Sequence, residues 1–258
     1  MPDLAGLAHR NLCDFTRFLG RLEQGAFLDE QGAVANAGPT DFPSSRTAIR
    51  ADCSLAATDW ADLVTGFFDA HGKSAMVYAR VGADDDLIAV LDTRGFRNWS
   101  QTPEMICEQR PERRVVPDGI TLRFANTAED FAAYAEIAGR AFTHIAMPAE
   151  LTSATMNNPE VMLGSDCVIA LADVDGTPVA GAMIVLFGPE PLAYVGWVSC
   201  IDEARGRGLG DVVTRRVTNE AFDRGAQLVT LEATQFGQNT YARMGYREIY
   251  RYAMLIRI

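Results

Sequence analysis

An arginine- and glycine-rich segment is the clearest chemical feature of this sequence. Residues Arg205–Gly210 read RGRGLG, and apolar residues recur behind them at helical spacing. Glycines let a backbone approach a ligand closely, and the first amides of a helix lack internal partners and point outward. We therefore expect a strand, a glycine turn and a helix that bind a phosphate group. The alternative is a structural turn beside a basic helix face.

Two other nucleotide-binding motifs fit the spacing less well. A dinucleotide fingerprint needs a third glycine where Asp211 stands, although Glu232 could then imitate its ribose-binding acid. The run Gly72-Lys73-Ser74 ends like a phosphate-binding Walker motif, but Phe67 occupies the position of the first glycine. We interpret that run as a turn.

A tyrosine followed by a glycine-aromatic pair forms a second motif. Tyr241 precedes Gly245 and Tyr246 in the pattern Y-x-x-x-G-Y, shortly after an expected strand at 228–233. A phenol with a reference pKa near 10 stays protonated at neutral pH, so Tyr241 can donate a proton. The alternative is a buried aromatic residue that only positions a ligand.

The two motifs together resemble the GNAT N-acetyltransferase superfamily. Its coenzyme A signature is an arginine or glutamine, then a glycine three residues on, then a glycine or alanine two further on. Arg205, Gly208 and Gly210 match every specified position. The family's tyrosine motif, which ends in glycine and phenylalanine or tyrosine, is matched from Tyr241 to Tyr246. The resemblance covers about residues 120 to 258.

The resemblance implies acetyl-coenzyme A as the cofactor and assigns residues to it. The end of the fourth family strand is expected to pair with the pantetheine arm, and the loop amides with the diphosphate. Thr234 stands where the family often has an asparagine, which puts that contact in doubt. The expected cofactor-binding residues are Val198, Ser199, Cys200, Arg205, Gly206, Arg207, Gly208, Leu209, Gly210, Asp211 and Thr234. Gly208→Val is expected to weaken cofactor binding while the fold survives.

Transfer from a thioester to an amine needs a base for the amine, donors for the developing oxyanion and an acid for the departing thiolate. The resemblance assigns Tyr241 as the acid. Glu232 is the candidate base, directly or through water, with a salt-bridged strand glutamate as the alternative. His144 is a second candidate base. Cys200 would suit a covalent route, but a small buried cysteine is the simpler account, and the resemblance implies direct transfer.

The elements that position these residues follow from apolar periodicity. Helices are expected at 4–22, 60–70, 127–142, 150–156 and 209–223, with a short one near Tyr241. Strands are expected at 74–81, 120–125, 167–174, 179–187, 193–201 and 228–233, and from Arg247. Residues 87–91 form a short apolar element and 32–45 a loop. This order favours an α/β fold, a mixed twisted sheet flanked by helices, as in GNAT acyl-CoA N-acyltransferases.

Residues 109–119, which hold two prolines and mostly polar side chains, are the expected linker. The chain is therefore divided into a degenerate GNAT-like domain at 1–115 and a catalytic GNAT domain at 116–258. Phe68 to Arg97 resembles a degraded copy of Phe222 to Arg247, without the glycine signature. A tandem arrangement with an inactive N-terminal half, which shapes the acceptor pocket or supports the sheet, is the resulting hypothesis.

The amino-acid composition restricts the classes of partner that we expect for this protein. The net charge is −11, which disfavours nucleic acid and anionic lipid. No apolar run approaches the roughly 20 residues of a membrane helix, and no secretory signal is evident, so we expect a cytoplasmic protein. Five scattered cysteines and three histidines indicate neither disulfides nor a metal site. We expect a monomer or homodimer.

The sequence thus predicts an acetyl-CoA-dependent N-acetyltransferase. Its acceptor would be a primary amine of a small molecule or a protein, but no pattern in the sequence identifies it. The alternative is a non-catalytic acyl-CoA-binding regulatory module, and retention of Tyr241 favours the enzyme.

Overall fold

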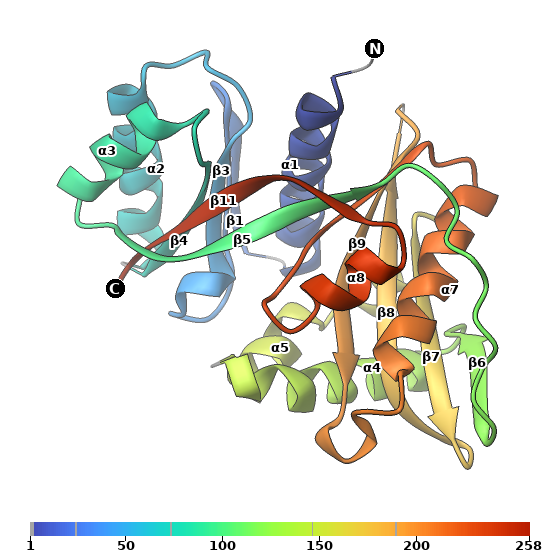
Figure 1. Cartoon of the computed structure of the whole chain (residues 1–258). Coiled ribbons are helices and arrows are strands. Elements are labelled where there is room, and N and C mark those ends of the chain that lie inside the picture. The colour runs from blue at the N-terminus through green and yellow to red at the C-terminus, as the bar shows by residue number, and fades with distance from the viewer. Residues whose placement is uncertain (1–2, 24, 73, 146, 189) are drawn as a thin grey trace. The chain divides into compact units, whose positions relative to one another are not determined.

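The computed structural model describes residues 3–23, 25–72, 74–145, 147–188 and 190–258 (Figure 1). The chain forms two compact units. One comprises Met1–Glu104 together with Glu248–Ile258, and the other comprises Met105–Arg247. Each unit consists of helices packed on strands, in agreement with the expected α/β class. Among the helices of the described residues, none has the length and apolar character that a membrane span requires.

The first unit is a mixed sheet with three helices. Its helices are α1 (Leu4–Glu23), α2 (Ala57–His71) and α3 (Asp85–Thr93), with a short 3-10 turn η1 (Pro43–Ser45). Its strands are β1 (Ala26–Glu30), β2 (Ala33–Ala37), β3 (Arg46–Arg50), β4 (Ala75–Arg80), most of β5 (Arg97–Cys107) and β11 (Arg247–Arg257). The order β1-β2-β3-β4-β11 brings the end of the chain beside β4, where Tyr252 pairs with Arg80 and Arg257 with Ala75.

A buried aromatic cluster holds α2 and α3 on this sheet. Trp60 and Phe68 of α2 are fully buried with Leu87 and Leu91 of α3. The short apolar element expected at 87–91 is therefore the buried side of a helix. The expectation of a loop over 32–45 was wrong at β2, because the small residues of Ala33–Ala37 carry little strand propensity but are all buried between β1 and β3.

The second unit carries the two motifs. Its strands are β6 (Ile120–Phe124), β7 (Cys167–Val174), β8 (Thr177–Phe187), β9 (Leu192–Cys200) and β10 (Leu228–Glu232). Its helical elements are α4 (Ala128–Phe142), η2 (Thr143–Ile145), α5 (Ala149–Thr155), α6 (Pro159–Met162), η3 (Asp202–Ala204), α7 (Leu209–Asp223) and α8 (Gln238–Arg243). The strand order is β10-β9-β8-β7-β6, in which β10 runs parallel to β9 and the other pairs are antiparallel.

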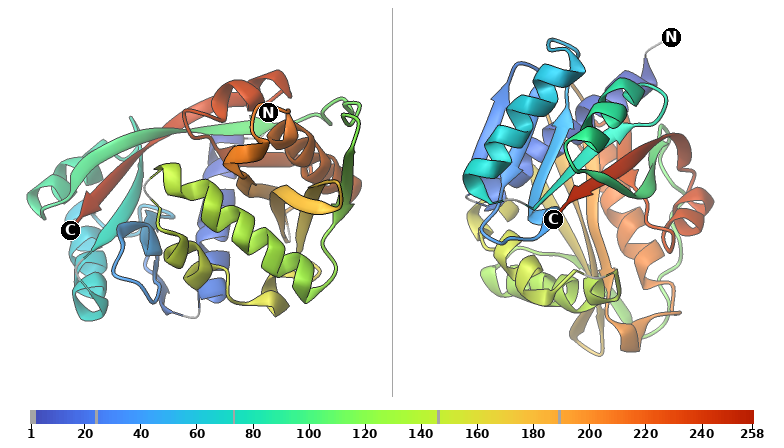
Figure 2. Two further views of the ribbon diagram at one scale, coloured as in Figure 1. Left: turned by 90° about the horizontal axis from the view of Figure 1, so that it is seen from below. Right: turned by 90° about the vertical axis from the view of Figure 1, so that its left-hand side faces the viewer.

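Helices α4 and α7 lie on opposite faces of that sheet (Figure 2). Thr127 caps α4 by accepting from the Asp130 amide, and the Asp130 side chain accepts from the Thr127 amide, so a capping box starts the helix expected at 127–142. The apolar stripe of α7 packs on the other face. Its members Leu209, Val212, Val213, Val217 and Ala221 are all buried.

Candidate functional site

Strands β9 and β10 diverge at the position of the candidate base. Their parallel register runs from Leu228 opposite Leu192 to Thr230 opposite Tyr194. Beyond it, the amide of Glu232 donates to the Tyr194 hydroxyl at 3.2 Å instead of to the β9 backbone. The last residues of β9 therefore extend past the part of the strand that pairs with β10. An extended ligand can pair with a strand edge of this kind.

The free part of β9 contains a bulge. Gly181 of β8 pairs with Ser199 and Met183 with Gly196, so one β8 residue faces both Trp197 and Val198. Trp197 has φ 51°, which is uncommon for a residue with a side chain. The buried Tyr134 of α4 donates its hydroxyl to the Trp197 carbonyl at 2.9 Å. Helix α4, on the face of the sheet opposite to α7, thus fixes the bulge. Neither Tyr134 nor Trp197 was identified from the sequence.

The glycine-rich loop joins β9 to α7 through the turn η3. Gly206 and Gly208 have φ 79° and 76°, a left-handed conformation that favours glycine. Gly208 is the N-cap of α7, and no side chain caps the helix. The first amides of α7 are therefore available to a ligand, and the 15-residue helix places its positive dipole end there.

Glu232, the last residue of β10, has an unusual environment. The Tyr194 hydroxyl contacts its Oε2 at 3.4 Å, while Oε1 is buried and has no hydrogen-bond partner among the described residues. Burial raises the pKa of this carboxyl to about 8, and the Tyr194 hydroxyl opposes that shift. Many carboxylates among the described residues contact arginines, but Glu232 does not. Its carboxyl can therefore take up a proton at neutral pH. The alternative of a salt-bridged strand glutamate is not what the structure shows.

Tyr241 lies on α8, the short helix that follows β10. Its ring packs near the Tyr246 ring, with centroids 6.1 Å apart, and against Gly237, where an added Cβ would lie 2.6 Å from the ring. The buried tyrosines Tyr134 and Tyr246 donate or share hydrogen bonds with Trp197 and Thr218, but Tyr241 Oη has no such partner among the described residues. Burial raises the pKa of Tyr241 to about 12, which keeps the phenol protonated.

These features lie at the carboxyl ends of two neighbouring parallel strands, which is where α/β sheets bind ligands. Comparison with known proteins gives a family match to part of the chain. The model of the acetyltransferase (GNAT) family matches residues 131–246. We refer to this matched region, 116 of the 258 residues, as the GNAT domain.

Solved structures share the fold over most of the chain. A GCN5-related N-acetyltransferase from Kribbella flavida is 22% identical and superposes with a TM-score of 0.71 over 97% of this chain and 95% of its own. One from Sphaerobacter thermophilus is 18% identical, with a TM-score of 0.64 over 88% and 76%. A tandem GNAT protein of the clavulanic acid biosynthesis pathway is 14% identical, with a TM-score of 0.60 over 87% and 78%. These confirm the expected GNAT fold. Among curated proteins, no sequence matches this chain.

The remaining motif residues of the GNAT domain have mixed surroundings. The Arg205 guanidinium contacts Asp202 at 2.9 Å and the Ala141 carbonyl at 3.3 Å, so it ties the loop to η3 and α4. Arg207 is exposed. The Leu209 side chain is buried, which leaves only its amide for a ligand. The Asp211 carboxylate contacts Arg215 and Arg114.

Residues at the end of β9 and after β10 complete the set. Val198 and Cys200 are partly exposed, and the Ser199 hydroxyl is 3.5 Å from the Gly181 carbonyl. Burial raises the pKa of the Cys200 thiol, which disfavours a thiolate nucleophile. The carbonyl of the exposed Thr234 accepts from the amides of Gly237 and Gln238 and so starts the turn into α8. The side chain of His144 lies outside the described part of the structure.

A separate cavity of about 460 Å³ lies in the same unit, between the linker, α7 and the end of α8. Arg110, Arg215, Arg243 and Arg247 line it with Glu108. It contains none of the residues expected to bind the cofactor. The described residues include no group of three or more histidine, cysteine, aspartate or glutamate side chains placed to hold a metal ion.

Gly210 gives a cleaner test of the loop than Gly208. Valine at Gly208 would be strained at φ 76°, because β-branched residues rarely adopt positive φ, so that variant would weaken the fold as well as binding. Gly210 has no positive φ, and a Cβ added there would meet nothing within 4 Å. Gly210→Val should weaken acetyl-CoA binding about tenfold or more without loss of thermal stability, because branched bulk obstructs a phosphate at the helix amides.

Gly210→Ala is the matched control, since the family signature accepts alanine at this position. Isothermal titration calorimetry should give it an affinity within a few-fold of wild type. Equal affinity of the valine variant and wild type would remove the loop from the site.

Tyr134→Phe tests whether the β9 bulge matters for turnover. The change leaves the partly buried Trp197 carbonyl without its donor, which should lower stability by about 1 to 2 kcal/mol. As the bulge relaxes, kcat should fall about tenfold, which corresponds to about 1.4 kcal/mol of transition-state stabilisation. Thermal melts and steady-state kinetics measure both effects. Tyr246→Phe removes a buried hydroxyl bonded to Thr218 and is the control; equal kcat losses in the two variants would assign the effect to stability alone.

Proposed function

We propose that this protein transfers an acetyl group from acetyl-coenzyme A to a primary amine of a small molecule or a protein, by direct attack in a ternary complex. The observation that carries the proposal is that three sets of groups lie together at the carboxyl ends of β9 and β10. The uncapped amino end of α7 suits a diphosphate, the free end of β9 suits the pantetheine amides, and Glu232 and Tyr241 supply a base and an acid.

The residues present fit the acyl donor. Space is open above Gly206 and Gly210, where a Cβ would meet nothing within 4 Å, so ligand oxygens can reach the loop amides. Past its pairing with β10, β9 offers main-chain groups at Val198 and Cys200, although the Cys200 carbonyl already accepts from Arg205 Nε at 3.4 Å. Bound there, acetyl-coenzyme A supplies an activated acyl group in a thioester.

Each catalytic residue then has a defined proton to move. Glu232 Oε1, which is buried and without a partner among the described residues, accepts the proton of the attacking amine, directly or through water. Tyr241 Oη donates its proton to the departing thiolate sulfur. Main-chain amides at the Trp197 bulge are the candidate donors to the acyl oxygen. Cys200 takes no part, because its thiol is held protonated.

An acceptor screen tests the proposal. Purified protein is incubated with acetyl-CoA and a panel of primary amines, including polyamines, amino sugars, aminoglycosides and lysine peptides, and thiol release is followed. We expect release that depends on one class of amine and an acetylated product of matching mass. Protection against heat by acetyl-CoA, combined with no amine-dependent thiol release across the panel, would instead identify a binding module.

A further inference from the structure

The linker that precedes the GNAT domain runs along α7 toward its amino end. Arg110 contacts Asp223, the last residue of α7, at 2.7 Å. Further along, the Glu112 carbonyl accepts from Arg215 at 2.9 Å, and Arg114 contacts Asp211 in the first turn at 2.6 Å. The linker is therefore antiparallel to α7 (Figure 1), and its contacts place Arg114 beside the glycine-rich loop.

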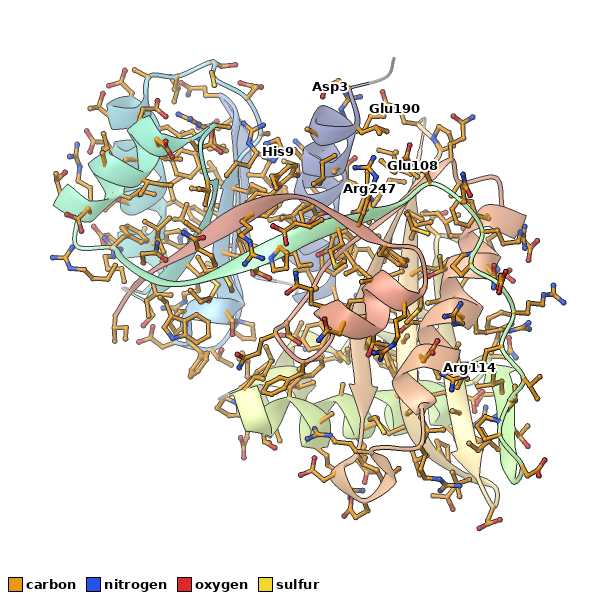
Figure 3. All side chains as sticks on the ribbon, in the orientation of Figure 1. Asp3, His9, Glu108, Arg114, Glu190 and Arg247 are labelled. Carbon is orange, nitrogen blue, oxygen red and sulfur yellow. The ribbon has the colours of Figure 1, made fainter. Side chains whose placement is uncertain are left out.

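Arg114 lies directly beside the amino end of α7. A Cβ placed on Gly208 would be 3.8 Å from Arg114 Nη1, so the guanidinium borders the loop itself. Figure 3 shows Arg114 alongside α7. The Arg114 side chain is 56% exposed and therefore keeps donors that face solvent.

The Asp211 carboxylate does not depend on Arg114 for its charge balance. It also contacts Arg215, whose side chain is only 13% exposed and lies one turn further along α7. The Asp211 side chain is only 8% exposed, so Arg114 is the solvent-facing member of the Arg114–Asp211 pair. A phosphate accepts charge-assisted and bidentate hydrogen bonds from a guanidinium. Arg114 is thus held beside the loop with donors to spare for an anion.

We infer that Arg114 is a further cofactor-binding residue, whose guanidinium donates to the diphosphate of the acyl donor at the loop Gly206–Asp211. This inference rests on the proposed function. Neither family motif includes the position, because it lies in the linker before residues 131–246. One arginine from outside the matched domain would then complete the phosphate site.

Calorimetric titration of wild type, Arg114→Gln and Arg110→Gln with coenzyme A and with dephospho-coenzyme A tests the inference. Arg114→Gln should weaken both ligands by the same factor, about tenfold, because both carry the diphosphate. Arg110→Gln removes the same charge from the same linker, together with its ion pair to Asp223, and should change affinity less than threefold. Both variants should remain folded, because Arg215 still contacts the buried Asp211 carboxylate in Arg114→Gln, and thermal melts check this.

Other outcomes separate the two proposals. Wild-type affinity in Arg114→Gln would overturn the inference and leave the proposed function intact. Loss with coenzyme A but not with dephospho-coenzyme A would assign Arg114 to the 3′-phosphate and overturn the diphosphate contact. Absence of binding by the wild-type protein would overturn the proposed function itself.

Discussion

Replacing Tyr241 with phenylalanine should lower kcat by about two to four orders of magnitude, the range expected when a general acid is removed. The change removes one hydroxyl and almost no volume. Tyr241 Oη has no hydrogen-bond partner among the described residues, so no structural bond is lost and the fold should survive. Affinity for acetyl-CoA should stay close to wild type.

Steady-state kinetics with one active amine distinguish this role from simple positioning. If Tyr241 only held the sulfur, the contact would be made in ground and transition states alike, and the Phe variant would show a raised KM for acetyl-CoA with nearly unchanged kcat. A kcat within threefold of wild type would exclude Tyr241 as the essential acid.

Replacing Glu232 with glutamine should lower kcat/KM by about two to four orders of magnitude, because the amide cannot accept the proton of the amine. In the wild type, kcat/KM should rise with pH through about 8, where the carboxyl ionises. The glutamine variant should lose that limb and retain only the dependence due to the amine. Glu129→Gln, which removes an exposed carboxylate of α4, should leave the profile unchanged.

Stability provides an independent measurement at Glu232. Its pKa in the folded state is about 8, above the reference value of 4.5, so the folded chain binds the proton more tightly than the unfolded chain does. The favourable contribution is complete below pH 4.5 and is lost as pH rises through 8. The glutamine variant, which resembles the protonated form, should therefore gain stability relative to wild type between pH 6 and 9. A constant difference across that range would contradict the assigned environment.

Local patterns in the sequence predicted most of the second unit. The helix that begins at 127, the apolar spacing of α7 and the strands β7 to β9 depend on neighbours close in sequence, and the structure confirms them. β2 and the pairing of β11 with β4 depend on distant partners, which local periodicity does not encode. The roles of the two halves, including an inactive N-terminal half, stay a prediction.

The motifs located the candidate site, but not the interactions that tune it. Nothing in the sequence pairs Tyr194 with Glu232, since their contact arises where two strands diverge. The left-handed backbone of Trp197 and its bond from Tyr134 likewise depend on packing across the sheet. Arg114 belongs to a segment whose composition indicated only a linker. The cofactor-binding and catalytic assignments themselves remain proposals.

A crystal structure of the complex with acetyl-CoA tests the central claim most directly. The account predicts the diphosphate on the amides between Arg207 and Asp211, the pantetheine arm along Val198–Cys200, and the thioester sulfur within about 3.5 Å of Tyr241 Oη. A cofactor bound elsewhere, or a sulfur out of reach of Tyr241 with Glu232 facing away from the acetyl group, would contradict it.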